Sequence, residues 1–448
     1  MASSVVRSSV LRGSAAKVRH YAAVAPAQSP SAAAAVAPAC QVLGNKVTVA
    51  TCDNNSPIAQ VSIVFRAGSR NETYDTQGTA HYMRIASGLS TSCSSSFAIT
   101  RNIQQLGGNL VTTVDRESIA YTLQITRNNL CNALNFLQDV AVKQVFKPWE
   151  VSDELPRLEY ELASLPESTL VLELLHKAAY RTGLGYSLFS PKHQLGKISS
   201  ETLQHFVSNW FTGPKCAVVA TGVPLSEIAG FATNLEIGSQ DRAVEASRYY
   251  GGELRKERAS DLTSVAVAVE GASLKNEQDA LACAILQRAS GSGARVKWGS
   301  SASPLQKHVS GVAGADPFAL STFNASYSDS GLFGFVLCST PIAAGSLTKA
   351  ACKWFKSMKV SDTDIARGKA TLKAEVLDAA DNGAALLESL QYQALFKGQV
   401  CTPASLIAEI EKTSASAVKS VADKLANGKL SMAAIGDLKT VPHVDELK

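Results

Sequence analysis

The chain has 448 residues, of which 46% are apolar and 18% charged, with a formal net charge of +5. This composition is that of a folded globular protein, and at ~100–200 residues per domain the length predicts two to four domains. No basic stripe with interleaved aromatic residues stands out, which argues against a nucleic-acid partner. No apolar run approaches the ~18–20 residues that a membrane-spanning helix needs.

The N-terminus has the composition of a targeting segment. The first acidic residue is Asp53, and four basic residues stand among early serines: Arg7, Arg12, Lys17 and Arg19. A basic, serine-rich and acid-free start is typical of a mitochondrial transit peptide, the alternative being a disordered tail of chance composition. Arg19-His20-Tyr21-Ala22 resembles a presequence processing site with the cut between Tyr21 and Ala22. We therefore expect a transit peptide over 1–21 and a flexible Ala/Pro/Ser-rich lead-in over 22–39.

The nine cysteines of the chain do not form a recognisable framework. Their number is odd and no two make a Cys-x-x-Cys pair. This pattern argues against both a disulfide scaffold and a zinc knuckle, and it indicates scattered thiols in a reducing compartment.

Hydrophobic periodicity and turn residues predict the elements of the first half. Strands are expected over Lys46–Thr51, Gln60–Ala67, Ser118–Thr126 and Lys215–Gly222, and helices over Gly78–Leu89, Asn128–Lys143, Pro148–Leu165, Glu173–Tyr180, Glu201–Phe211 and Pro224–Asn234. Residues 236–247 are polar and without a period, which predicts a linker. Near the C-terminus, Ala404–Leu425 is expected to be one surface helix with a single buried face.

The second half repeats the first. Gln60–Glu72 and Leu262–Glu277 each consist of an apolar strand, a turn of small residues and an Asn-Glu pair that is expected to start a helix. Met83 and Leu286 open similar segments 203 residues apart. This spacing predicts two duplicated α+β domains, 40–235 and 248–448, joined by the linker 236–247. Each is expected to hold a mixed, mainly antiparallel sheet with helices packed on one face.

The predicted helix Gly78–Leu89 contains the residues that bear on chemistry: His81, Arg84 and Ile85. The helix resembles that of the pitrilysin-like zinc peptidases, whose signature is His-x-x-Glu-His. In that pattern two histidines at i and i+4 share a helix face and bind one zinc ion, and the glutamate is the general base. Here only His81 matches, because Arg84 stands at the position of the base and Ile85 at that of the second ligand.

A third zinc ligand of that family would fall within Asp153–Leu162. The register there leaves three positions open, Arg157, Glu159 and Glu161. One histidine with at most one carboxylate is too few for catalytic zinc, which usually has three protein ligands. We therefore predict no catalytic residue and no bound metal at this degenerate site, and a packed or hydrogen-bonded role for His81.

The resemblance extends along the chain after residue 40. Four further segments match family patterns in order: Gly107–Thr113, His176–Tyr180, Phe323–Phe335 and Leu430–Leu438. The last of these, with Val444–Leu447, is similar to the noncatalytic members that serve as core subunits of ubiquinol–cytochrome c reductase, respiratory complex III. Gly291-Ser292-Gly293 with Arg295 and Lys297 lacks the spacing of a phosphate-binding loop. A loop at the mouth of a cavity is expected there, or a short version of the processing peptidase's substrate-gripping loop.

The resemblance implies a structural and assembly subunit without cofactors. It implies a peripheral position on the matrix side of the mitochondrial inner membrane, within a dimeric complex. The implied partners are core protein 1, cytochrome b, cytochrome c1, the Rieske iron–sulfur protein and small subunits. The alternative is the noncatalytic presequence-binding subunit of the mitochondrial processing peptidase. An active zinc peptidase is a third possibility, and Arg84 and Ile85 argue against it.

Overall fold

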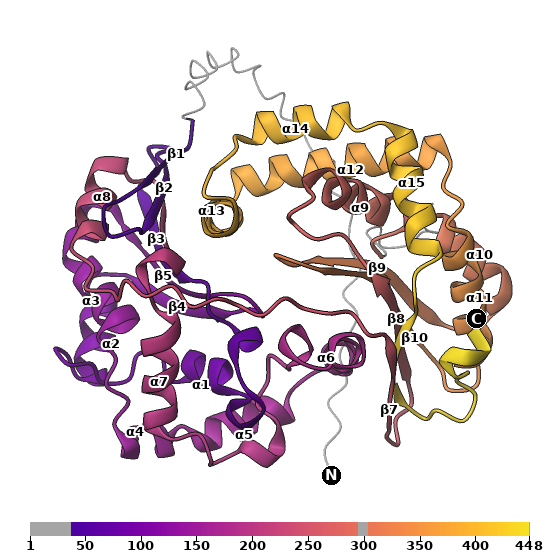
Figure 1. The fold of residues 1–448 in the computed structure, drawn as a ribbon, viewed down its shortest axis with the longest axis horizontal. Coiled ribbons are helices and arrows are strands. Elements are labelled where there is room, and N and C mark those ends of the chain that lie inside the picture. The colour runs from indigo at the N-terminus through magenta and orange to yellow at the C-terminus, as the bar shows by residue number, and fades with distance from the viewer. Residues whose placement is uncertain (1–36, 294–302, 448) are drawn as a thin grey trace, which may run out of the picture. The chain divides into compact units, whose positions relative to one another are not determined.

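The structure, a computed structural model, describes residues 37–293 and 303–447. The expected transit peptide with Tyr21 and Ala22, most of the lead-in, and Arg295 and Lys297 lie outside the described residues. The described strands form two mixed sheets, with the orders β1-β2-β6-β3-β5-β4 and β7-β11-β8-β10-β9 (Figure 1). Their bounds are β1 Ala39–Val42, β2 Thr48–Cys52, β3 Ile58–Phe65, β4 Asn109–Val114, β5 Ile119–Thr126, β6 Cys216–Thr221, β7 Gly252–Glu257, β8 Thr263–Glu270, β9 Phe318–Ser326, β10 Gly331–Ser339 and β11 Ser431–Gly436.

The two sheets have the same topology once β1 is set aside. Strands β2 to β6 of the first correspond, in chain order, to β7 to β11 of the second. The single parallel pair is β2–β6 in one sheet and β7–β11 in the other, and the remaining neighbours are antiparallel. The strand β3 starts at Ile58 and β8 at Thr263, 205 residues later. The predicted duplicated α+β fold is therefore confirmed.

Each half packs its own helices on one face of its sheet. The described helices are α1 Thr79–Ile85, α2 Ser96–Gln105, α3 Leu130–Val142, α4 Pro148–Asp153, α5 Leu155–Ala163, α6 Glu167–Tyr180, α7 Ser200–Trp210, α8 Leu225–Thr233, α9 Glu277–Ser290, α10 Pro304–Ala313, α11 Ala344–Ser357, α12 Asp362–Asp381, α13 Gly383–Lys397, α14 Pro403–Lys412 and α15 Ala415–Ala426. In the first half, Val61, Ile63 and Phe65 of β3 share one core with α1, α3 and α7. None of the described helices has the length and apolar character to cross a membrane.

The other face of the first sheet is covered by a helix from the second half. Leu387 and Leu390 of α13 pack on Ala50, Ala217 and Val219 in β2 and β6. Side chains alternate between the faces of a strand, so this face differs from the one that meets α1 and α3. The two alanines leave room for the helix to approach the sheet closely. Figure 1 shows α13 beside these strands.

The second sheet is covered in the reciprocal way. The helix α6, from the first half, sets Val171 and Leu175 against Ala266, Ala268 and Ala433 of β8 and β11. The sheet again presents alanine to the helix that arrives from the other half. Burying a Val or Leu side chain contributes about 1.5–3 kcal/mol, so both contacts couple the folding of one half to that of the other.

A buried ion cluster also joins the halves. The guanidinium of Arg70, only 5% exposed, pairs with Glu117 and with Asp329 of the β9–β10 turn. The Ser328 N–H donates to Glu117 Oε2 at 2.9 Å, and the Ser247 N–H donates to Asp329 Oδ2 at 2.7 Å. Asp329 and Glu117 together raise the pKa of Arg70 against the opposing effect of burial. The cluster therefore contains two buried carboxylates that share one arginine as their counter-ion.

Two predicted helices are each divided in two. Pro148–Leu165 forms α4 and α5, because Pro156 has no N–H to donate to the preceding turn. Ala404–Leu425 forms α14 and α15, because Thr413 is extended and the Ser414 hydroxyl accepts from the Ala417 N–H to cap a new helix.

The Asn-Glu pair of the first half does not start a helix, contrary to the prediction. Asn276 does cap α9, but Asn71 and Glu72 start no α-helix: short 3₁₀ turns occupy this region and α1 begins only at Thr79. The Glu72 carboxylate is used at a distance, as a cap for α1.

We predict that Arg70→Met destabilises the chain by about 3–5 kcal/mol, because Glu117 and Asp329 would stay buried without their counter-ion. The measurement is the free energy of unfolding from denaturant titration. Arg127→Met is the matched control: it breaks a pair with Asp53 at 3.2 Å in which Arg127 is 36% exposed. That exposed pair should be worth at most about 1 kcal/mol. Equal losses in the two variants would contradict a role for the buried cluster in holding the halves together.

Candidate functional site

The helix α1 is held at its start by a buried glutamate. The Glu72 carboxylate accepts hydrogen bonds from the N–H groups of Gly78 at 2.8 Å and Ala80 at 2.7 Å, which satisfies two otherwise unpaired donors of the first turn. Burial raises the pKa of Glu72 to about 8, against the lowering effect of these two N–H groups. Gly78 has φ +92°, and a Cβ there would lie 2.4 Å from the Ser190 hydroxyl, so only glycine fits.

His81 is almost fully buried, with 1% of its surface exposed. Its Nδ1 accepts a hydrogen bond from the Ser190 N–H at 3.1 Å, and its ring meets the edge of Phe189 at 5.5 Å between centroids. Burial, followed by the charge of Arg84, lowers the pKa of His81 to about 4. The ring is therefore neutral near pH 7. Because Nδ1 accepts, the proton lies on Nε2, which faces Glu161 Oε2 at 3.5 Å.

The structure settles which of the three open positions approaches His81. Glu161, on α5, lies beside His81 and Arg84. Arg157 instead turns to Glu154 at 3.3 Å, with 63% of its side chain exposed. No described hydrogen bond or ion pair brings Glu159 to His81.

The three positions of the signature now have distinct surroundings. His81 is engaged by the Ser190 N–H, and the Arg84 guanidinium pairs with the Glu161 carboxylate. Ile85 is 1% exposed and packs in the apolar core of the first half. The carboxylate that would serve as a zinc ligand is thus neutralised by a fixed cation, and the second histidine is replaced by a hydrocarbon. These residues do not fit a catalytic zinc centre.

Within the described ranges, no group of three or more His, Cys, Asp and Glu side chains is placed to hold a metal ion. Sequence reasoning found His81, Arg84 and Ile85 but missed Glu72 and Ser190. Ser190 stands 109 residues from His81, and Glu72 lies outside the spacing of a capping box. No local pattern could have revealed either contact.

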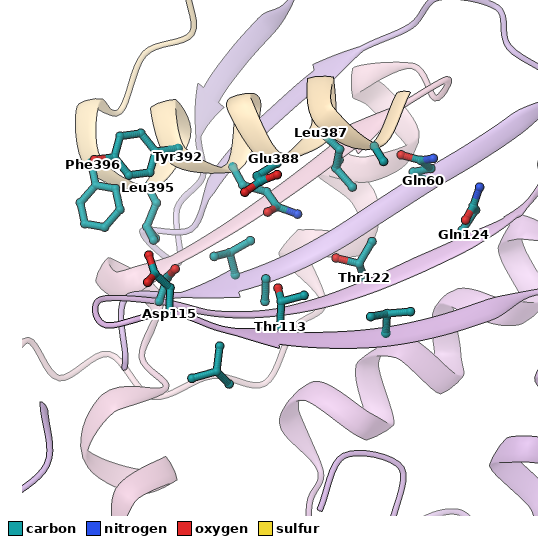
Figure 2. A pocket seen from close by; sticks show the side chains of 17 residues that line it. Gln60, Thr113, Asp115, Thr122, Gln124, Leu387, Glu388, Tyr392, Leu395 and Phe396 are labelled. Carbon is teal, nitrogen blue, oxygen red and sulfur yellow. The ribbon is translucent and has the colours of Figure 1, made fainter. Parts of the chain in front are cut away.

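A cavity of about 540 Å³ lies between α13 and the strands β3, β4 and β5 (Figure 2). Leu387, Tyr392, Leu395 and Phe396 form its helical wall, and Gln60, Thr122 and Gln124 stand on the strands opposite. Asp115 and Glu388 bring two carboxylates to the lining, which contains no Lys, Arg or His among the described residues. The Arg66 guanidinium lies 5.2 Å above the Phe396 ring, so a cation is near but outside the lining.

Comparison with known proteins gives two family matches. Residues 48–192 match the model of insulinase (peptidase family M16), and residues 197–372 match that of the peptidase M16 inactive domain. The mitochondrial cytochrome b-c1 complex subunit 2 of Homo sapiens is 36% identical over 413 residues, 90% of this chain and 91% of that protein. The same subunit of Rattus norvegicus is 35% identical over equal shares.

A second group of relatives is more distant. The probable mitochondrial-processing peptidase subunit alpha-1 of Arabidopsis thaliana is 26% identical over 417 residues, 90% of this chain and 83% of that protein. The resemblance carried by the segments around His81 and after residue 40 is therefore confirmed. Because the similarity exceeds 30% identity over 90% of its length, the chain belongs to peptidase family M16.

Proposed function

We propose that the chain is core protein 2, a noncatalytic structural and assembly subunit of mitochondrial respiratory complex III. The observation that carries the proposal is the difference in identity: 36% to the human cytochrome b-c1 complex subunit 2 against 26% to the Arabidopsis processing-peptidase subunit, over equal shares of this chain. A subunit of this kind acts through the surface that it buries against its partners, so it needs no active site of its own.

The geometry around α1 supports a noncatalytic role. A general base at position 84 would have to accept a proton, which an arginine side chain does not do in proteins. The same cation pairs with Glu161 and repels a divalent metal. We propose that His81 is a packing residue here, because its hydrogen bond to the Ser190 N–H links α1 to the 187–192 segment.

Partners and place follow from the same proposal. The chain would pair with core protein 1 and contact cytochrome b, cytochrome c1, the Rieske iron–sulfur protein and small subunits of a dimeric complex. It would lie on the matrix side of the inner membrane, peripheral to it, after processing between Tyr21 and Ala22. We also propose the boundaries 40–235, 236–247 and 248–448 for the two domains and their linker.

The second candidate is the presequence-binding subunit of the processing peptidase. The cavity under α13 favours it, because Asp115 and Glu388 would attract a basic presequence. The lower identity to the processing-peptidase subunits places it second.

We predict that the tagged full-length chain migrates with cytochrome b and cytochrome c1 on a native gel of mild-detergent mitochondrial extract. Co-purification followed by subunit identification should recover core protein 1 in a one-to-one ratio. A tagged processing-peptidase subunit, run in parallel, marks the position of the soluble heterodimer. Migration of the chain at that position would refute the complex III assignment in favour of the second candidate.

The degenerate site can be tested by rebuilding it. The purified native chain should contain no stoichiometric zinc. Arg84→Glu with Ile85→His should bind about one zinc ion per chain, because His81, the new histidine at i+4 and the freed Glu161 would supply three ligands. Equilibrium dialysis with metal analysis measures this. Adding Glu161→Gln to the double variant is the control and should weaken zinc binding by at least about tenfold. Stoichiometric zinc in the native chain would contradict the proposal.

The packing role of His81 predicts a pH dependence of stability. Its folded-state pKa of about 4 lies below the ordinary 6.5, so the unfolded chain takes up the proton first as pH falls. The contribution of the neutral His81 to the free energy of unfolding is therefore complete above pH 6.5 and is lost as pH falls towards 4. His81→Gln keeps an oxygen acceptor for the Ser190 N–H but does not titrate. Between pH 7 and 4 the native chain should therefore lose about 2–3 kcal/mol more than this variant in denaturant titration. Equal losses of unfolding free energy in the native chain and the variant would show that His81 is not held neutral.

A further inference from the structure

A second cavity, of about 610 Å³, lies where the end of α5, the helix α6, the 187–192 segment and β7 meet. It sits at the seam between two apolar cores: Leu162 packs against the core of the first sheet, whereas Leu170 and Leu174 pack against the core between α6 and the second sheet. Leu165, Phe189 and Ile435 complete the large apolar lining; Ile435 is buried, and the other five side chains are half-buried. The volume falls within the ~300–1,000 Å³ range of small-molecule sites.

Four cations surround this lining: Lys177, Lys192, Lys256 and Arg258. The three lysine ammonium groups are exposed and have no ion-pair or hydrogen-bond partner among the described residues. Arg258 faces Glu167 at 3.7 Å with 58% of its side chain exposed, which is a weak pair.

The one carboxylate in the lining does not offset these charges. Glu173 Oε1 pairs with Arg116 at 2.5 Å, and its Oε2 accepts the Leu188 N–H at 2.9 Å. The cavity therefore combines an apolar interior with an uncompensated positive rim.

Two polar groups of the lining are occupied within the fold, whereas the buried Ser190 hydroxyl has no hydrogen-bond partner among the described residues. The Ser190 N–H donates to His81, and the Ser187 hydroxyl accepts from the Phe189 N–H. A peptide backbone placed against Leu162, Leu170 and Leu174 would find no polar partner on those side chains, at a cost of about 1–3 kcal/mol for each N–H or C=O group left unpaired. An aliphatic chain has no such groups. The N-terminal segment of this chain is basic and acid-free, so the positive rim would repel it.

We propose that this cavity binds a long-chain aliphatic carboxylate. The hydrocarbon lies against Leu162, Leu170 and Leu174, and the carboxylate lies among the ammonium groups of Lys177, Lys192 and Lys256. Apolar burial supplies the affinity, because each methylene removed from water contributes favourably. The cations select a negative head over a neutral or positive one. This binding is separate from the proposed role in complex III and does not depend on it.

The test uses the purified full-length chain and displacement of a fluorescent long-chain fatty acid, cis-parinaric acid. Dodecanoate should displace the probe. Dodecyltrimethylammonium, with the same chain and the opposite charge, should need at least about tenfold more, and hexanoate at least about a hundredfold more. A glutamate-rich peptide that displaces the probe better than dodecanoate would overturn the proposal and assign the rim to an acidic protein partner.

Variants separate the contribution of the cations from that of the apolar cavity. Lys177→Glu with Lys256→Glu should weaken dodecanoate binding by at least about tenfold and remove its preference over the cationic amphiphile. Lys359→Glu is the matched control, because Lys359 is exposed and lies away from the lining. This variant should bind dodecanoate as the native chain does. Ala163→Trp, at an exposed position of the lining, should narrow the cavity and weaken dodecanoate binding by at least about tenfold while the melting temperature stays that of the native chain. Native affinity in both the charge-reversed and the narrowed variant would exclude this cavity as the site.

Discussion

The architecture depends on one constraint: each sheet has two apolar faces, and its own half supplies helices for one of them. The remaining faces are covered by exchange, with α13 lying on the first sheet and α6 on the second. Neither half covers both faces of its sheet with its own helices, so we expect the folding of each half to be coupled to the docking of the other. The alanines at both exchanged contacts allow close packing, and the buried ion pairs of Arg70 with Glu117 and Asp329 would be broken by a shift of one half against the other.

The helix α1 is held in place by contacts that do not involve a metal. Glu72 caps the start of α1, Gly78 has the backbone conformation that lets Ser190 approach, and His81 receives the Ser190 N–H. Ile85 adds to the core. Each of these contacts would persist without zinc, so a chain that has lost the base and the second ligand still folds in the family's way. The Arg84–Glu161 pair then replaces a metal–ligand interaction with an ion pair.

The two cavities differ in charge although both lie at contacts between the halves. The space under α13 carries Asp115 and Glu388, whereas the space beside α6 is surrounded by lysines. Each exchanged helix contributes one of these charges, Glu388 on α13 and Lys177 on α6, and the adjoining strands and loops contribute the others. Each helix has an apolar face that the opposite sheet requires, which leaves its polar positions free to set the charge of the adjoining space.

Local sequence determined two features: the absence of the general base and the second histidine of the zinc-peptidase signature, and the repeated order of strands and helices. Arg84 and Ile85 lie three and four residues after His81 on one helix, so spacing alone identifies them. The repeated order of apolar strand, turn of small residues and Asn-Glu pair marks β3 and β8 as equivalent strands. Only the tertiary structure decided that Glu161, and neither Arg157 nor Glu159, approaches His81, because the break between α4 and α5 sets the rotation of α5. The packing of α6 and α13 on the opposite sheets is likewise visible only in the tertiary structure. Periodicity shows which face of a helix is apolar, but not which distant surface that face will cover.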